Sequence, residues 1–169
     1  MVGYRTEKIN DRDEVSDEQL RSFQNLMTKL LQWCHERAQY QSVKFDLPDA
    51  EIRCLMLFDG EQSLTPKKIA GSMNIVKSRV SKVLDGLAKK GLITRVKHQK
   101  DSRLLLLNLT RHGHGKVEEI KKFNDYIHKK VLMTMRPEQR KTLLAALNTL
   151  QASLKSSREI MFHETQSIE

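Results

Sequence analysis

The sequence is poor in the features that mark secreted and membrane proteins. It contains two cysteines, Cys34 and Cys54, and both fall inside helical patterns rather than in a paired loop framework. This usage fits reduced thiols in a cytoplasmic protein. No apolar run approaches about 18 residues, so we expect no membrane-spanning helix. The residues after Met1 lack an apolar h-region, so we expect no signal peptide either.

Signatures of enzymes are also lacking. The seven glycines stand mostly at predicted turns and helix caps, which leaves none for a glycine-rich cofactor cradle. No Gly-x-Ser-x-Gly elbow, phosphate loop or paired metal-ligand signature occurs in the sequence. The sequence therefore predicts a protein that is not an enzyme and that needs no cofactor or metal.

What the sequence does have is a local concentration of positive charge. Residues 61–116 carry 13 basic and three acidic side chains, a net charge of +10. Residues 1–60 carry −3 and residues 117–169 carry +2, for a total of +9. A basic excess confined to one segment is the electrostatic footprint of a polyanionic partner. The alternative is a solvated basic face without a partner.

Apolar stripes occur near both ends of the chain. Spacings of three and four place Leu20, Phe23 and Met27 on one face of a helix predicted from about residue 16 to residue 40, with Ser16 as its N-cap. A second stripe follows Pro137 at near-heptad spacing and comprises Leu143, Leu147, Leu150, Leu154 and Met161. Because exposing so much apolar surface is unfavourable, the stripes favour dimerisation over the alternative of a monomeric helical subdomain.

The basic middle third begins with two short predicted helices. The first covers about residues 48–59, with its proline at the first helical position. Thr65 is the N-cap of the next helix, which ends at Asn74. Asparagine tolerates the left-handed backbone conformation that a tight corner between helices requires. The pattern predicts a helix-turn-helix.

The next predicted helix, about residues 76–90, separates an apolar face from a polar one. It ends at Gly91, the usual position of a C-terminal glycine. Gly86 lies inside this helix, where glycine costs up to about 1 kcal/mol relative to alanine, so we expect close packing there. The exposed face is predicted to carry Lys77, Ser78, Arg79, Ser81 and Lys82.

A hairpin follows the basic helix. Residues 92–96 form a predicted strand, residues 98–102 its polar tip and residues 103–109 the return strand. The return strand contains four consecutive leucines, which would require apolar cover on both faces. Thr110 is then predicted to cap another helix.

Five short segments follow one another in a specific order and spacing: Leu64-Thr65, Val80-Ser81-Lys82-Val83-Leu84-Asp85-x-Leu87, Lys90-Gly91-Leu92-Ile93-x-Arg95, Asp101-x-Arg103 and Leu109-Thr110-x-x-Gly113. In these segments, residues 47–115 resemble the winged-helix core of the MarR (multiple antibiotic resistance regulator) family. The resemblance implies a mainly α fold with a small β-hairpin wing. It divides the chain into an N-terminal extension with a first dimerisation helix (1–46), a winged helix-turn-helix domain (47–115) and C-terminal dimerisation helices (116–169).

For function, the resemblance implies a homodimeric regulator of transcription, most simply a repressor of a pseudo-palindromic operator in double-stranded DNA. The first, fifth and sixth helices of two copies would intertwine. Such a protein would be cytoplasmic, bacterial or archaeal, and associated with the nucleoid. The alternatives are an architectural or anti-silencing protein that coats DNA without reading it, and a redox- or metal-responsive regulator.

DNA contacts are assigned by residue type and position. The exposed face of the 76–90 helix is expected in the major groove, with Arg79 or Lys82 reading guanine. By analogy with the family, Arg103 enters the minor groove or grips its edge, and Asp101 orients it. Phosphate contacts are expected from Thr65, Lys67, Arg95, Lys97 and Lys100.

The effector is less defined by the sequence. Family members typically bind an aromatic or phenolic molecule between the dimer helices and the DNA-binding lobe, and the plausible neighbours of such a pocket are Trp33, Tyr40, Phe45 and Arg53. We interpret Cys34 as a buried packing residue rather than a redox sensor. A metal site would draw on Cys34, His35, Glu36, His112, His114 and His128, but their spacing favours surface histidines.

Overall fold

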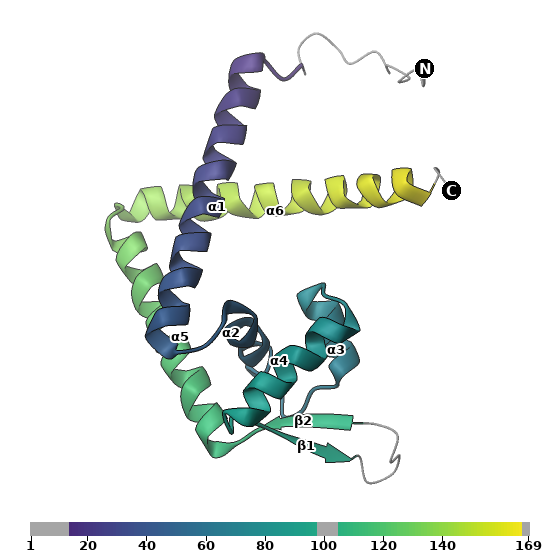
Figure 1. Ribbon diagram of the computed structural model, residues 1–169. Coiled ribbons are helices and arrows are strands. Elements are labelled where there is room, and N and C mark those ends of the chain that lie inside the picture. The colour runs from purple at the N-terminus through teal and green to yellow at the C-terminus, as the bar shows by residue number, and fades with distance from the viewer. Residues whose placement is uncertain (1–13, 98–104, 167–169) are drawn as a thin grey trace. The chain divides into compact units, whose positions relative to one another are not determined.

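The computed structural model describes residues 14–97 and 105–166 of the chain (Figure 1). It confirms a mainly α protein with one two-stranded antiparallel sheet. The elements in chain order are α1 (Asp17–Phe45), α2 (Asp49–Met56), α3 (Pro66–Met73), α4 (Lys77–Lys89), β1 (Ile93–Lys97), β2 (Leu105–Leu109), α5 (Arg111–Met133) and α6 (Pro137–Gln166). They form two compact units, residues 1–117 and 118–169, and α5 runs from one unit into the other.

Helix α1 begins where the sequence predicts and ends later. The Ser16 side chain accepts a hydrogen bond from the Gln19 N–H, and the Gln19 side chain accepts one from the Ser16 N–H, which completes a capping box. The helix continues five residues beyond the predicted end at residue 40. Gln41 and Phe45, four residues apart on one face, are buried, so packing stabilises a last turn that the apolar stripe does not reveal.

Helix α2 is shorter than predicted at both ends. Pro48 is its N-cap, with a ψ of 145°, rather than its first helical residue. At the other end, the N–H groups of Leu57 and Phe58 donate to carbonyl oxygens only three residues back, each at 3.1 Å. This tightening ends regular α-helix at Met56, before the predicted end at residue 59, and leads into the turn at Gly60.

The predicted signals of α3 and α4 are confirmed. The side chain of Thr65 caps α3, and Pro66 occupies the first turn. Asn74 adopts the left-handed conformation with a φ of 51° and ends the helix. After α4, Gly91 has a φ of 66°, which L side chains adopt at a cost. These local signals produce the corner between α3 and α4 and the entry to the hairpin.

The hairpin pairs Ile93 with Leu109 and Lys97 with Leu105 at its two ends. On its other edge, β2 forms an isolated bridge in which Leu64 and Leu107 exchange hydrogen bonds of 3.0 and 2.8 Å. Leu107 is fully buried, whereas Leu105 and Leu106 are half-buried. The sequence predicts apolar cover on both faces of the leucine run. Among the described leucines of the run, only Leu107 is fully covered.

The core of the first unit joins α2, α3, α4 and the hairpin. Its largest fully buried side chains are Leu55, Leu64, Ile69, Leu87, Leu92 and Leu107. The buried face of α4 comprises Val80, Val83, Leu84 and Leu87, as the sequence predicts. The Thr110 hydroxyl accepts a hydrogen bond of 2.9 Å from the Gly113 N–H, which confirms the predicted cap of α5.

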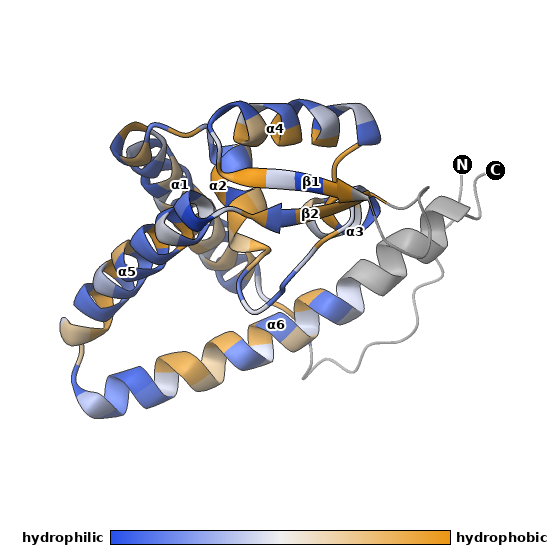
Figure 2. Cartoon of the chain, turned by 90° about the horizontal axis from the view of Figure 1, so that it is seen from below, coloured by the Kyte–Doolittle hydropathy of each residue, from blue (hydrophilic) through white to orange (hydrophobic). Residues whose placement is uncertain are grey.

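The apolar stripes of α1 and α6 are not buried within the chain. Leu20 is 47% exposed and Phe23 45% exposed on α1, while Leu147 is 44% exposed and Leu154 47% exposed on α6. Figure 2 shows hydrophobic and hydrophilic residues interspersed along α6. Cys34 on α1 is exposed as well, so the expectation that it is a buried packing residue is wrong for the single chain.

No helix within the described residues combines the length and apolar character needed to cross a membrane.

Candidate nucleic-acid interface

The exposed face of α4 is the most basic helical surface of the first unit. Lys77, Ser78, Arg79, Ser81 and Lys82 are all exposed, as predicted, and the first turn carries no acidic residue. The Ser81 hydroxyl donates to the Lys77 carbonyl oxygen at 3.3 Å. The opposite face of α4 is buried in the core, which holds the helix with its cations toward solvent. This arrangement suits insertion into a groove of DNA.

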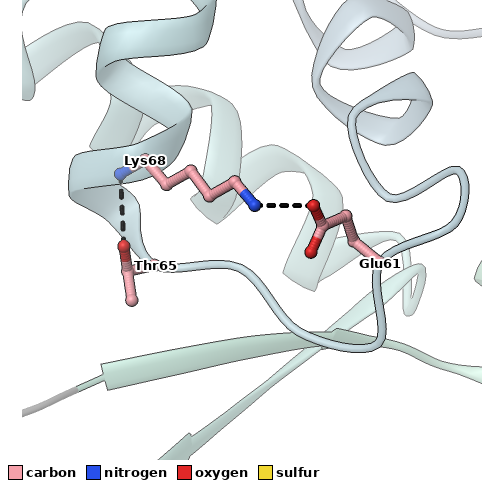
Figure 3. Close-up of polar contacts among 3 residues, drawn as sticks. All are labelled: Glu61, Thr65 and Lys68. Carbon is pink, nitrogen blue, oxygen red and sulfur yellow. Dashed lines mark hydrogen bonds and ion pairs between the residues drawn. The ribbon is translucent and has the colours of Figure 1, made fainter.

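A second cluster of polar side chains, Glu61, Thr65 and Lys68, lies at the start of α3 (Figure 3). The Lys68 N–H donates to the Thr65 hydroxyl at 3.2 Å, and the Lys68 ammonium donates to the Glu61 carboxylate at 2.6 Å. Lys67 is exposed. The predicted phosphate contacts Thr65 and Lys67 thus stand at a helix N-terminus, with the neighbouring lysine occupied by an ion pair.

The hairpin is tied to α4 by an ion pair that the sequence did not reveal. The Arg95 guanidinium on β1 donates to the Asp85 carboxylate on α4. Both side chains remain partly exposed. Arg95, expected to contact phosphate, therefore already has an anionic partner in the structure, and any phosphate contact would have to share or replace it.

A second unpredicted pair lies deeper, between α2 and the end of α4. The Glu51 carboxylate is buried and accepts a hydrogen bond of 2.7 Å from the Lys90 ammonium. A Cβ added at Gly86 would overlap the Glu51 carboxylate. This explains the glycine inside α4 and confirms the close packing expected there. The glycine was the sequence signal, but it could not identify the partner.

Most of the predicted wing contacts fall outside the described residues. Lys100, Asp101 and Arg103 lie outside the described residues, as do the side chains of Lys97 on β1 and Met161 on α6. Their assignments stay predictions.

The four residues predicted near an effector differ in environment. The Arg37 guanidinium lies 5.5 Å from the centroid of the Trp33 ring, and Tyr40 is exposed on the same helix. Phe45 is buried, with the ammonium groups of Lys44 and Lys116 about 6 Å from its ring. Arg53 is directed elsewhere, since it donates to the Met73 carbonyl oxygen at 3.5 Å and pairs with Asp49 at 4.0 Å.

The two thiols have opposite environments. Burial, with a smaller contribution from the Glu51 charge, raises the pKa of the Cys54 thiol from about 9 to about 12. Cys34 is exposed. His112, His114 and His128 are exposed, which confirms the surface interpretation of these histidines. Across residues 14–97 and 105–166, no cluster of three or more His, Cys, Asp or Glu side chains could hold a metal ion.

Comparison with known proteins agrees with this geometry. The model of the MarR family matches residues 47–105, which contain α2 to the start of β2. The HTH-type transcriptional repressor YetL of Bacillus subtilis (strain 168) is 33% identical over 75 residues, 43% of this chain and 45% of YetL. The winged-helix region of the chain is therefore similar to the MarR family. This is a family of transcription regulators, and the match to YetL spans less than half of that relative's length.

Solved structures extend the MarR-like fold over most of the chain. A mutant of MepR from S. aureus is 23% identical with a TM-score of 0.71, covering 78% of this chain and 98% of MepR. FabT of Streptococcus pneumoniae, solved in complex with DNA, is 21% identical with a TM-score of 0.71, covering 79% of this chain and 98% of FabT. At these identities the likeness concerns the fold, which is the winged helix flanked by long helices.

Proposed function

We propose that this protein is a MarR-like regulator: a homodimeric, sequence-specific repressor that binds a pseudo-palindromic operator and is released by a small-molecule effector. The observation that carries the proposal is the exposed basic face of α4, backed by a buried apolar face. The name of YetL as a repressor and the complex of FabT with DNA support it. The protein would act on chromosomal DNA in the cytoplasm.

In this proposal, Lys77, Arg79 and Lys82 enter the major groove, and Arg79 or Lys82 reads guanine. Thr65 and Lys67 contact phosphate at the start of α3. The wing residues Lys97, Lys100, Asp101 and Arg103 complete the contacts. Arg95 acts mainly through Asp85, because their ion pair anchors the hairpin to α4.

The dimer would use the half-exposed stripes of α1 and α6, named above by Leu20, Phe23, Leu147 and Leu154. A dimer places two copies of α4 on one side of the DNA, with half-sites about one helical turn apart. We place the effector near Trp33 and Tyr40 on α1, where an exposed ring already has a guanidinium beside it.

The first test is selection of genome fragments by the purified protein at about 150 mM salt, where non-specific phosphate attraction is weakened. We expect enrichment of one inverted repeat. Salt-sensitive binding to all fragments, with no repeat enriched, would instead support the architectural alternative.

Charge neutralisation on α4 then locates the interface. A triple variant with Lys77→Gln, Arg79→Gln and Lys82→Gln should bind the repeat at least about tenfold more weakly, because each base contact contributes about 1–3 kcal/mol. The slope of log affinity against log salt should become shallower by about 0.9 for each phosphate that the variant leaves unneutralised. The matched control, with Lys122→Gln, Lys129→Gln and Lys141→Gln, removes the same charge from α5 and α6. Equal weakening of DNA binding in the two variants would contradict the assignment to α4.

A further inference from the structure

The residue immediately before α4 has an apolar side chain at the N-cap position. Val76 is the N-cap, with extended backbone angles of −68° and 152°, and no side chain caps the helix. Helices favour Ser, Thr, Asp or Asn at this position, because their oxygens accept a hydrogen bond from a free N–H. Ser16 and Thr65 do this for α1 and α3, whereas Pro48, the N-cap of α2, provides no side-chain cap. The helix whose exposed face carries the proposed DNA contacts therefore has no side-chain N-cap.

Among the described residues of the winged-helix region (47–97 and 105–115), Val76 also has the most exposed large apolar side chain. Of the 17 large apolar side chains exposed among the described residues, 15 lie on or beside α1, α5 and α6. The remaining two are Val76, 69% exposed, and Val96 on β1, 43% exposed. The proposed dimer accounts for apolar exposure on the long helices α1 and α6, but it gives no reason for an apolar side chain at the start of α4.

The surroundings of Val76 narrow the kind of partner that fits it. Isolated apolar residues are common on protein surfaces, but this one stands beside Lys77, Ser78 and Arg79, all exposed. A protein surface that covered the valine would also cover these cations. The major groove of DNA suits both the valine and the cations. Phosphates border the groove, and the thymine C5-methyl group is an apolar feature of its floor. The N-terminal residues of a recognition helix are the ones that reach base edges.

We propose that Val76 is a specificity-determining residue that reads one thymine in each half-site, through contact of its methyl groups with the thymine C5-methyl. This inference rests on the proposed function, because it requires α4 to lie in the major groove of a selected operator. It adds a base preference that the cationic residues do not provide, since arginine and lysine favour guanine.

The experiment replaces single thymines of the selected operator by deoxyuridine, which keeps base pairing and lacks only the C5-methyl group. For the wild-type protein, one position per half-site should weaken binding about fourfold, the effect of about 0.8 kcal/mol for one buried carbon. Val76→Ser supplies a capping hydroxyl but removes both γ-methyl groups. It should raise the melting temperature, weaken operator binding and abolish the difference between thymine and deoxyuridine at that position.

Two further variants separate base reading from general damage. Val76→Thr keeps one γ-methyl group together with a hydroxyl, so it should retain sensitivity to deoxyuridine. Val96→Ser changes the other exposed valine of this region and should leave the sensitivity unchanged. If the wild-type protein and Val76→Ser respond equally to every substitution, Val76 does not read thymine. If no operator is selected at all, the proposed function fails first, and this inference fails with it.

Discussion

Similar apolar residues are buried in the winged-helix region but exposed on the long helices α1 and α6. Leu55, Leu64 and Leu87 are almost fully buried among α2, α3, α4 and the hairpin. Leucines at helical spacing on α1 and α6 remain about half exposed in the same chain. The winged-helix region therefore has a core of its own, whereas the stripes of α1 and α6 have a surface that a second copy could cover. We expect the destabilising effects of substitutions in the two regions to differ in magnitude and in their dependence on protein concentration.

The largest effect is expected in the core. Leu87→Ala removes a fully buried side chain of α4 and should lower the free energy of unfolding by about 3 kcal/mol, because it leaves a cavity as well as losing burial. Denaturant unfolding at two protein concentrations measures this. The loss should be the same at both concentrations. A loss below about 1 kcal/mol would contradict a self-sufficient core.

An intermediate effect is expected where the core contains charge. Lys90→Met leaves the buried Glu51 carboxylate without the ammonium that lies 2.7 Å away. We expect a loss of about 1–2 kcal/mol in the free energy of unfolding, less than for a fully buried pair because Lys90 is partly exposed. The double variant Glu51→Gln with Lys90→Met should recover much of this loss. Equal instability of the single and double variants would show that the unpaired Glu51 charge does not cause the loss.

The matched leucine substitution on α6 should cost less in the single chain. Leu147→Ala removes a side chain that is 44% exposed, so we expect about 1 kcal/mol or less at low protein concentration. Its main effect should be dissociation of the proposed dimer, which sedimentation across a concentration series measures. A dimer as stable as that of the wild type would show that the α6 stripe does not form the interface.

The smallest structural change is alkylation of the thiols. It compares the accessibility of one sulfur atom in each region, Cys34 on α1 and Cys54 on α2. At pH 8, Cys34 should react with iodoacetamide while Cys54 stays unmodified until the protein unfolds, and peptide mass spectrometry distinguishes the two. The folded state holds the Cys54 pKa near 12, above its ordinary value near 9. The neutral thiol therefore contributes stability below about pH 9, and this contribution is lost as the pH rises toward 12. Equally fast reaction of both thiols would contradict the burial of Cys54.

Much of the winged-helix region follows from local signals in the sequence. Thr65-Pro66 begins α3, Asn74 ends it, Gly91 follows α4 and Thr110 caps α5, each where predicted. Hydrogen bonds within a few residues determine these boundaries, so the residue types alone reveal them. The exposed face of α4 was equally readable, because helical periodicity assigns each residue to a side.

Errors in the prediction arose where packing opposed a local signal. The last turn of α1 persists because Gln41 and Phe45 are buried, and nothing in the stripe of α1 predicts that burial. Cys34 belongs to an apolar stripe and is nonetheless exposed, because periodicity identifies a face without showing what covers it. Periodicity also does not show that Phe45 is buried or that Arg53 donates to the Met73 carbonyl oxygen on α3; the effector role of these residues stays a prediction.

The sequence by itself determined the order of the helices, their capping residues and the concentration of cations between residues 61 and 116. These properties depend on neighbours along the chain. Only the tertiary structure decided that Asp85 binds Arg95, that Glu51 binds Lys90 beside Gly86, and that Val76 is left exposed at the start of α4. The ion pairs join residues 10 and 39 positions apart, and the exposure of Val76 depends on which elements pack around it. Local patterns carry no information about such distances, which packing of the whole core sets.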